Sequence, residues 1–248
     1  MHKSGLYLYA IIPAAVTLGP ILGIHDKRVY TVREGDVAAV VSDTDNQKIR
    51  PQRKNLACHQ QVLHSLMSSV TPLPIKFGTI TEDKKELEEL LQHHHDSFSQ
   101  QLHSLKNTVE MGLRLNWCVP NIFEHLVHTH SELKAMREQV MAKSQSGRDD
   151  MIEIGYRLSQ ALEEERRQHT KIAQEALADF CLDTKVNNLR KENEVMNLAC
   201  LITKDKLPVF EKKVYAIARL FNDDFILDYN GPWAPHNFVD ISISLNAD

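Results

Sequence analysis

The stretch TPLPIKFGTI, residues 71–80, carries the most specific local signals in this chain. Pro72 and Pro74 each fix their own φ at about −65° and push the preceding residue out of the α region, so the segment enters extended. The alternation then predicts a strand that carries three side chains on one side, Ile75, Phe77 and Thr79. Gly78 predicts a bulge or a close approach of another backbone.

A helical pattern follows at once, starting near Glu82 with Thr79 or Thr81 as the predicted cap and acidic residues in its first turn. Residues 71–80 contain no nucleophile, no acid/base pair and no glycine run that would hold a phosphate. This strand-to-helix corner therefore predicts an architectural role.

The composition is that of an ordinary soluble chain, with 248 residues, 42% hydrophobic and 25% charged. No apolar run approaches the roughly 20 residues of a membrane helix, so we expect no lipid-membrane partner. The net charge of −4 gives no basic footprint for a phosphate backbone, so we expect no nucleic-acid partner.

Two local features indicate the compartment. The alternation of Leu6–Tyr9 favours a strand over a cleaved signal peptide. The cysteines Cys58, Cys118, Cys181 and Cys200 are scattered without a CxxC pair, which predicts buried free thiols in a reducing cytoplasm.

The first 106 residues predict an N-terminal α+β domain, 1–106. Its expected strands are 5–13, 28–33, 36–42 and 71–80, with a hairpin at Glu34-Gly35, and its helices are 51–66 and about 82–105.

Residues 107–248 predict a second domain, again α+β. The expected order is strand 108–119, helices 120–141 and 148–181, a hairpin partner at 184–191, strand 194–203, helix 206–221 and strand 225–229. A turn at 231–235 and a last strand at 238–245 complete it. This order is that of a ferredoxin-like split βαβ domain with an enlarged helical crossover that includes one long helix.

Several stretches together resemble the gas vesicle protein F/L family (GvpF and GvpL). They are GLYLYAII at 5–12, DVAAVVSDT at 36–44, HQQVL at 59–63, PLPIKFGTI at 72–80, EMGLRLNW at 110–117 and GPWAPHNFVDI at 231–241. The most specific matching residues are Pro72, Leu73, Pro74, Lys76, Phe77, Gly78, Gly231 and Pro232. The family usually opens its long helix with a Gly-Arg-aromatic-Leu run. Here GRDDMIEIGY at 147–156 keeps only Gly147 and Arg148, which leaves the roles of the following side chains open.

The resemblance implies a non-enzymatic accessory protein of gas vesicles, the buoyant gas-filled protein shells of aquatic microbes. Such proteins are minor vesicle components that are needed for vesicle formation. The resemblance implies contact with the very hydrophobic major shell protein and with other accessory proteins. It places the protein in the cytoplasm at the vesicle, with the gas-facing surface as one option.

A shell subunit with an apolar surface needs a soluble partner to cover it, and an edge strand or an amphipathic helix can do so. We expect the docking surface on the last strand, on the first strand 5–12 or on the long helix. The candidate contact residues are Phe238, Val239, Ile241, Ile243 and Trp233.

Other residue clusters predict ordinary roles. His93, His94 and His95 point about 100° apart on a helix, so they predict a solvated face. His125, His128 and Glu132 share one helical face and offer three metal ligands, but no HExxH motif supports them. Glu163–Glu165 beside Arg166 and Arg167 predict an exposed, ion-paired helix.

We expect no cofactor, no metal and no catalytic residue, because no nucleotide-binding or catalytic motif is present. The alternative function is a ligand- or metal-binding regulatory module, since split βαβ folds host many such functions.

Overall fold

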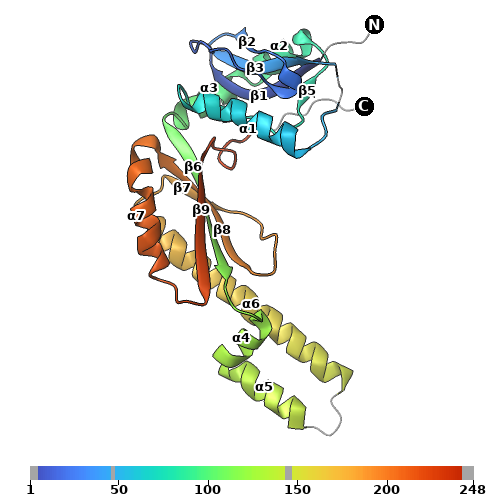
Figure 1. The fold of residues 1–248 in the computed structure, drawn as a ribbon, viewed down its shortest axis with the longest axis vertical. Helices are drawn as coiled ribbons and strands as arrows, with labels where there is room; N and C mark the ends of the chain where they lie inside the picture. Colours follow the sequence, from blue (N-terminus) through green and yellow to red (C-terminus); the bar gives the residue numbers. More distant parts are fainter. Residues whose placement is uncertain (1–4, 46–47, 143–146, 242–248) are drawn as a thin grey trace. The chain divides into compact units, whose positions relative to one another are not determined.

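The computed structural model describes residues 5–45, 48–142 and 147–241, drawn as a ribbon in Figure 1. It is an α+β protein whose chain divides into two compact units. The first contains residues up to 110, 201–204 and the described end of the chain, 232–241; the second contains 111–200 and 205–231. The predicted division at 106/107 placed 201–204 and 232–241 in the second domain, whereas the chain returns to the first unit at both places.

The first sheet has the order β2-β3-β1-β4, and β5 also pairs with β1. Its strands are β1 (Gly5–Pro13), β2 (Val29–Glu34), β3 (Val37–Thr44), β4 (Leu73–Pro74) and β5 (Ile80–Thr81). The predicted hairpin is confirmed: β2 and β3 are antiparallel, with Glu34 opposite Val37, and Gly35 turns the chain at φ 58°. Strand β1 has neighbours on both sides and is buried along almost its whole length.

The stretch 71–80 is not the single strand that its alternation predicts. It forms β4, a turn and β5, and Gly78 adopts φ 90°. The prolines explain this, because Pro72 and Pro74 have no N–H to extend a ladder. The close backbone approach predicted at Gly78 does not occur, since a Cβ there would meet nothing within 4 Å. The segment pairs with β1 at other residues: Ile75 N donates to Tyr9 O at 2.9 Å, and Leu8 N donates to Thr79 O at 3.0 Å.

Helices cover both faces of the first sheet. They are α1 (Arg53–Met67), α2 (Lys84–His93) and α3 (His95–Ser104). The helix expected from Glu82 is interrupted at His94, and its cap is Asp83, whose Oδ1 accepts from Glu86 N at 3.0 Å. One apolar cluster joins the sheet to α2 and α3 through Leu87, Leu91 and Phe98. The other joins it to α1 through Val62, Leu63 and Leu66.

The second sheet has the order β7-β8-β6-β9. Its strands are β6 (Thr108–Trp117), β7 (Asp183–Val186), β8 (Glu194–Thr203) and β9 (Phe225–Trp233). The predicted strand 194–203 is confirmed at both ends. Strand β9 continues through Gly231 and Pro232, where the sequence predicts a turn; Gly231 allows this at φ 122°.

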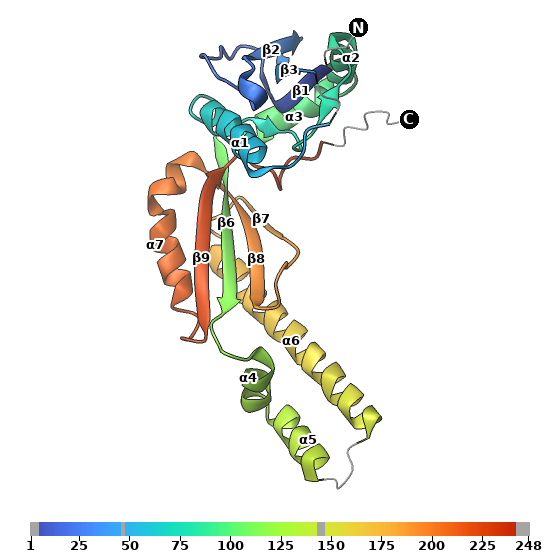
Figure 2. The same cartoon turned by 45° about the vertical axis from the view of Figure 1, so that its right-hand side comes forward.

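The helices of the second unit are α4 (Ile122–Thr129), α5 (Ser131–Ala142), α6 (Arg148–Leu177) and α7 (Leu207–Ala218). The helix expected over 120–141 is broken at His130. Figure 2 shows α6 as a long rod with α4 and α5 beside its first half, and both short helices contact it. Short 3₁₀ turns lie at Ile24–Asp26 and Lys204–Lys206. Within the described ranges, no helix is long and apolar enough to cross a membrane.

The last predicted strand is wrong for residues 238–241, which form a turn and extended chain without strand pairing. Phe238 N donates to Pro235 O at 3.0 Å, which closes a tight turn. The apolar alternation there reflects packing on a core, since Phe238, Val239 and Ile241 are partly buried against the first apolar cluster. Residues 242–245, including Ile243, lie outside the described ranges.

Candidate functional site

Two segments that are far apart in the sequence meet in the first unit. Residues 71–80 and the C-terminal segment, which we define as residues 234–241, line one cavity of about 320 Å³. The lining residues are Pro74, Ile75, Lys76, Thr79, His236, Val239 and Ile241. We call this cavity the motif pocket, because its walls are the two most specific sequence motifs.

Side-chain hydrogen bonds hold the C-terminal segment in place. The Glu110 carboxylate, which is only 6% exposed, accepts from Asn237 N at 2.8 Å and from Asn237 Nδ2 at 2.6 Å. Gln101 makes a second pair of bonds: its Nε2 donates to Asp240 O at 2.9 Å, and its Oε1 accepts from Asp240 N at 2.8 Å. The segment is thus held like a strap, without strand pairing.

Aromatic rings and a histidine form a buried cluster that includes Phe77 of the turn in 71–80. The hydroxyl of Tyr7 lies 2.9 Å from His59 Nδ1 and accepts from Gly78 N at 3.2 Å. The His59 ring is stacked on Tyr9 and meets Phe77 edge-on, with centroids 5.5 and 5.7 Å apart. Burial, and then the charge of His236, lower the pKa of His59 to about 4. Burial also raises the pKa of Tyr7. The cluster is therefore neutral at pH 7.

Tyr9 extends this network to the loop before β2. Its hydroxyl lies 2.9 Å from Ser42 Oγ and accepts from Ile24 N at 2.8 Å. A Cβ on Gly23 would lie 2.1 Å from that hydroxyl, so this position requires glycine. The network positions backbone and has no activated nucleophile in it. Across the described ranges, no group of three or more His, Cys, Asp or Glu side chains is placed to hold a metal.

The predicted contact residues differ in their accessibility. Trp233 is 41% exposed at the end of β9. Phe238, Val239 and Ile241 are partly buried against the core of their own unit and do not form a free edge. Among the family-motif residues, Pro72, Leu73 and Pro74 are buried. Lys76, Gly78 and Gly231 are exposed, and Phe77 and Pro232 lie between these classes.

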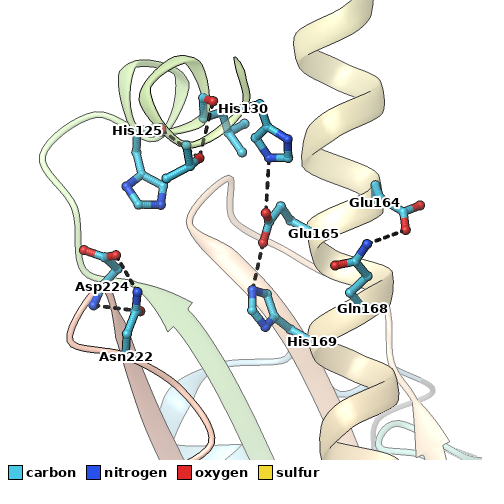
Figure 3. Close-up of polar contacts among 10 residues, drawn as sticks. His125, His130, Glu164, Glu165, Gln168, His169, Asn222 and Asp224 are labelled. Carbon is cyan, nitrogen blue, oxygen red and sulfur yellow. Dashed lines mark hydrogen bonds and ion pairs between the residues drawn. The ribbon is translucent and has the colours of Figure 1, made fainter. Parts of the chain in front are cut away.

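The second unit contains a polar cluster that the sequence did not predict, shown in Figure 3. Glu165 of α6 lies between two imidazoles, 3.2 Å from His130 Nε2 and 2.8 Å from His169 Nε2. His169 also packs against Phe221 and Phe225, with ring centroids 5.5 and 4.5 Å away. The i,i+4 spacing of Glu165 and His169 was a usable sequence signal. The approach of His130, from the break between α4 and α5, was not.

Two other histidine clusters differ in the structure from what the sequence predicted. His128 Nδ1 lies 2.6 Å from the carbonyl oxygen of Glu124, and the helix break at His130 separates His125 and His128 from Glu132. The three residues therefore do not share the single helical face that their spacing suggested. In the triple-histidine run, His95 is not simply solvated: its Nε2 lies 2.7 Å from Asp36. Asp96 first, and also Asp36, raise the pKa of His95.

The charged middle of α6 is only partly as predicted. The ion pairs of Glu163 with Arg166 and of Glu164 with Arg167 are confirmed. However, the Arg166 side chain is only 16% exposed, since it donates to the carbonyl oxygens of Glu194 and Glu192 at 3.1 and 2.9 Å. It also lies over the Trp117 ring.

The first half of α6 carries apolar side chains that face solvent. Met151, Ile152 and Tyr156 are 60%, 59% and 57% exposed. Ile152 and Tyr156, four residues apart, are neighbours on the helix surface, and Met151 directly precedes Ile152. Acidic residues adjoin them: Asp149, Asp150 and Glu153.

The thiols also depart in part from the prediction of buried cysteines. All four are free, but only Cys200 is buried; Cys58 and Cys181 are intermediate, and Cys118 is exposed.

The chain belongs to the gas vesicle synthesis protein GvpL/GvpF family, whose model matches residues 5–240. It is 26% identical to gas vesicle protein F of Nostoc sp. over 97% of this chain and 100% of the relative. It is 25% identical to gas vesicle protein F of Haloferax mediterranei over 97% and 96%. It is 24% identical to gas vesicle protein L of Streptomyces sp. over 89% and 86%.

Two crystal structures have the same fold. GvpF from Anabaena sp. PCC7120 superposes with a TM-score of 0.85 at 24% identity, covering 97% of this chain and 100% of that one. GvpF from Microcystis aeruginosa gives a TM-score of 0.82 at 23% identity, covering 96% and 99%.

Proposed function

We propose that this protein takes part in gas vesicle assembly, and so in buoyancy, by binding the hydrophobic major shell protein. The family match over residues 5–240 supports the gas vesicle role. In this proposal the protein acts without catalysis in the cytoplasm, together with other gas vesicle accessory proteins, and associates with the vesicle.

The strand order of the second sheet, β7-β8-β6-β9, supports a finer assignment of the fold. A split βαβ domain places its first and third strands in the middle of the sheet and its second and fourth at the edges. Here β6 and β8 are central, and α4–α6 form the enlarged first crossover. We assign the second unit to the ferredoxin-like class on this basis.

The observation that carries the binding proposal is the exposed apolar face of α6, formed by Met151, Ile152 and Tyr156. The two strand surfaces that the sequence suggested fit the role poorly. Strand β1 is central in its sheet and has no free edge, and residues 238–241 are packed on a core. The α6 face, by contrast, offers exposed apolar surface, which favours association in water.

A capture experiment tests the docking surface. Tagged full-length protein is co-expressed with the shell protein, either as wild type or with the double change Ile152→Glu and Tyr156→Glu. We expect the amount of recovered shell protein to fall about tenfold or more, because burying two unpaired carboxylates at an apolar contact is energetically unfavourable. Tyr215→Glu on α7 is the matched control, since Tyr215 is 63% exposed elsewhere in the same unit. Equal recovery with all three proteins would reject the α6 face.

Flotation separates the possible modes of action. Vesicles are floated from a native lysate and probed for this chain before and after a urea wash. Retention through the wash identifies a built-in component, and loss in the wash identifies a peripheral coat. Absence from vesicles, with recovery alongside soluble shell protein, identifies an assembly factor. Absence from both fractions would reject the gas vesicle role.

A further inference from the structure

The first unit contains a cavity of about 350 Å³ that shares no lining residue with the motif pocket. Small-molecule sites in proteins have volumes of about 300–1,000 Å³. Its walls come from the end of β1, the turn between β2 and β3, residues 69–71 after α1, and α3 with the two residues near its end. Lys204, which follows β8 and belongs to the same unit, completes the wall. We call this cavity the lysine cavity, after Lys106 and Lys204.

Positive charge dominates the wall of the lysine cavity. Two lysines line it, Lys106 and Lys204, and Asp36 is the one acidic residue among its described lining residues. Both carboxylate oxygens of Asp36 already have partners on α3: His95 Nε2 lies 2.7 Å from Oδ1, and Ser99 Oγ donates to Oδ2 at 3.0 Å. In the described part of the chain, no carboxylate forms an ion pair with either lysine. The cavity therefore favours a negatively charged ligand.

Lys204 is held in a defined position at this wall. Its Nζ donates to Met67 O at 2.7 Å and to Val70 O at 3.4 Å, at the end of α1 and just after it. Its backbone N–H donates to Asn107 O at 2.9 Å. An ammonium group has three N–H donors, so the two carbonyl oxygens leave one donor for a further acceptor. Burial lowers the pKa of Lys204, and a bound anion would oppose that effect.

We propose that the lysine cavity binds the phosphate group of a small molecule. Lys204 supplies a positioned N–H donor, and Lys106 supplies a second positive charge. Lysine ammonium groups bind phosphate as point charges. A phosphate monoester carries about −1.5 to −2 charges at pH 7, which matches two lysines better than the single charge of a carboxylate. His103 and Ser69 add polar side chains to the wall, and Leu102 provides apolar surface for a short carbon chain.

Calorimetric titration of the full-length protein tests the proposal. Inorganic phosphate and glycerol 3-phosphate are titrated at constant ionic strength, with chloride as the balancing anion. We expect saturable one-to-one binding of both, with a Kd below about 1 mM. Succinate, whose two charges lie on separate carboxylates, should bind more weakly than either. Absence of saturable binding by the two phosphate compounds, or equally tight binding of succinate, would overturn the proposal.

Matched variants locate the site. Lys106→Gln removes an exposed charge, and Lys204→Met removes the positioned donor; each should weaken the binding of inorganic phosphate by about tenfold or more. Lys54→Gln is the control, since Lys54 is exposed on α1 of the same unit and does not line the cavity. It should bind phosphate as the wild type does. Unchanged affinity in Lys106→Gln, or equal weakening in Lys54→Gln, would reject the site.

Lysine acetylation gives a second readout that needs no variant and decides the question if Lys204→Met does not fold. Wild-type protein is acetylated with and without saturating inorganic phosphate, and the modified peptides are mapped by mass spectrometry. Phosphate should slow the modification of Lys106 and leave that of Lys54 unchanged. Equal rates at Lys106 would contradict the proposal. All lining residues belong to the first unit, so these results are independent of the α6 face.

Discussion

The Tyr7 hydroxyl lies 2.9 Å from Nδ1 of His59, across 52 positions of sequence. The same hydroxyl accepts from Gly78 N at 3.2 Å. One buried contact thus connects β1, α1 and the turn inside residues 71–80. Burial is the main cause of the lowered pKa of His59, and it makes the stability of the first unit sensitive to pH.

His59 predicts a loss of stability in mild acid. Its pKa is about 4 in the folded protein and about 6.5 in an unfolded chain. Between these values the unfolded chain binds more protons, so stability rises with pH. The contribution is complete above about pH 6.5, is lost as pH falls towards 4, and amounts to about 3 kcal/mol. Urea denaturation between pH 4 and pH 7 measures it.

Matched variants isolate this effect from other titrations. His59→Gln should be less stable at pH 7 but should show a flatter decline between pH 6.5 and pH 4. Tyr7→Phe removes the hydroxyl and leaves Gly78 N and His59 Nδ1 without it. It should lower stability by about 1–3 kcal/mol and keep the acid-sensitive decline. Parallel pH curves for wild type and His59→Gln would contradict the assignment.

Sequence patterns predicted helices and strands best where one hydrophobic pattern continued through the whole element. The alternation in β6, the largely apolar run in β8 and the hairpin at Gly35 specified these elements almost to the residue. The pattern wrongly predicted a strand at 238–241, where apolar side chains alternate because the C-terminal segment packs on a core. A period of two reports which side chains are buried, not which backbone groups are paired. The alternation in residues 71–80 was misleading in the same way, because Pro72 and Pro74 have no N–H to extend the pairing of a single strand.

The polar clusters were less predictable than the strands. Glu165 looked solvated because its neighbours Glu163, Glu164 and Arg167 are. Its partner His130 lies 35 positions away and approaches only because the chain breaks between α4 and α5. Asp36 and His95 are likewise distant in sequence. Pairs of this kind depend on tertiary placement, which local periodicity does not encode.

Gly35 predicts a measurable steric effect. It adopts φ 58°, and a Cβ there would lie 2.8 Å from His95 Nε2. Gly35→Ala should cost about 1–2 kcal/mol from the left-handed backbone alone, and it should also displace His95 from Asp36. Gly19→Ala is the control, because a Cβ there meets nothing within 4 Å. Thermal unfolding of both variants measures the difference, and equal stability would show that the turn relaxes freely.

The hydrogen bonds of Glu110 lead to a prediction about how strongly the C-terminal segment is held. Glu110→Ala removes both acceptors of Asn237 from a buried position, which should cost about 1–3 kcal/mol. Amide hydrogen exchange should accelerate at Asn237 and at Asp240, since the strap has no strand pairing to retain it. Gln101→Ala is the comparison: its bonds to Asp240 lie on the exposed side, so its effect should be smaller. A larger effect from Gln101→Ala would show that the bonds of Gln101, and not those of Glu110, contribute most to holding the C-terminal segment.

Glu165 predicts the stability of the helical arm formed by α4 and α5. Its carboxylate is 25% exposed and meets both His130 and His169, so Glu165→Ala leaves two imidazole nitrogens without this partner. We expect a loss of about 1–3 kcal/mol in urea denaturation, with faster amide exchange in α4 near His130. Glu164→Ala is the matched control one position earlier, since Glu164 and its partner Arg167 are 40% and 76% exposed and this surface ion pair should contribute less than about 1 kcal/mol. Equal losses in the two variants, or unchanged exchange in α4, would show that the carboxylate does not join the arm to α6.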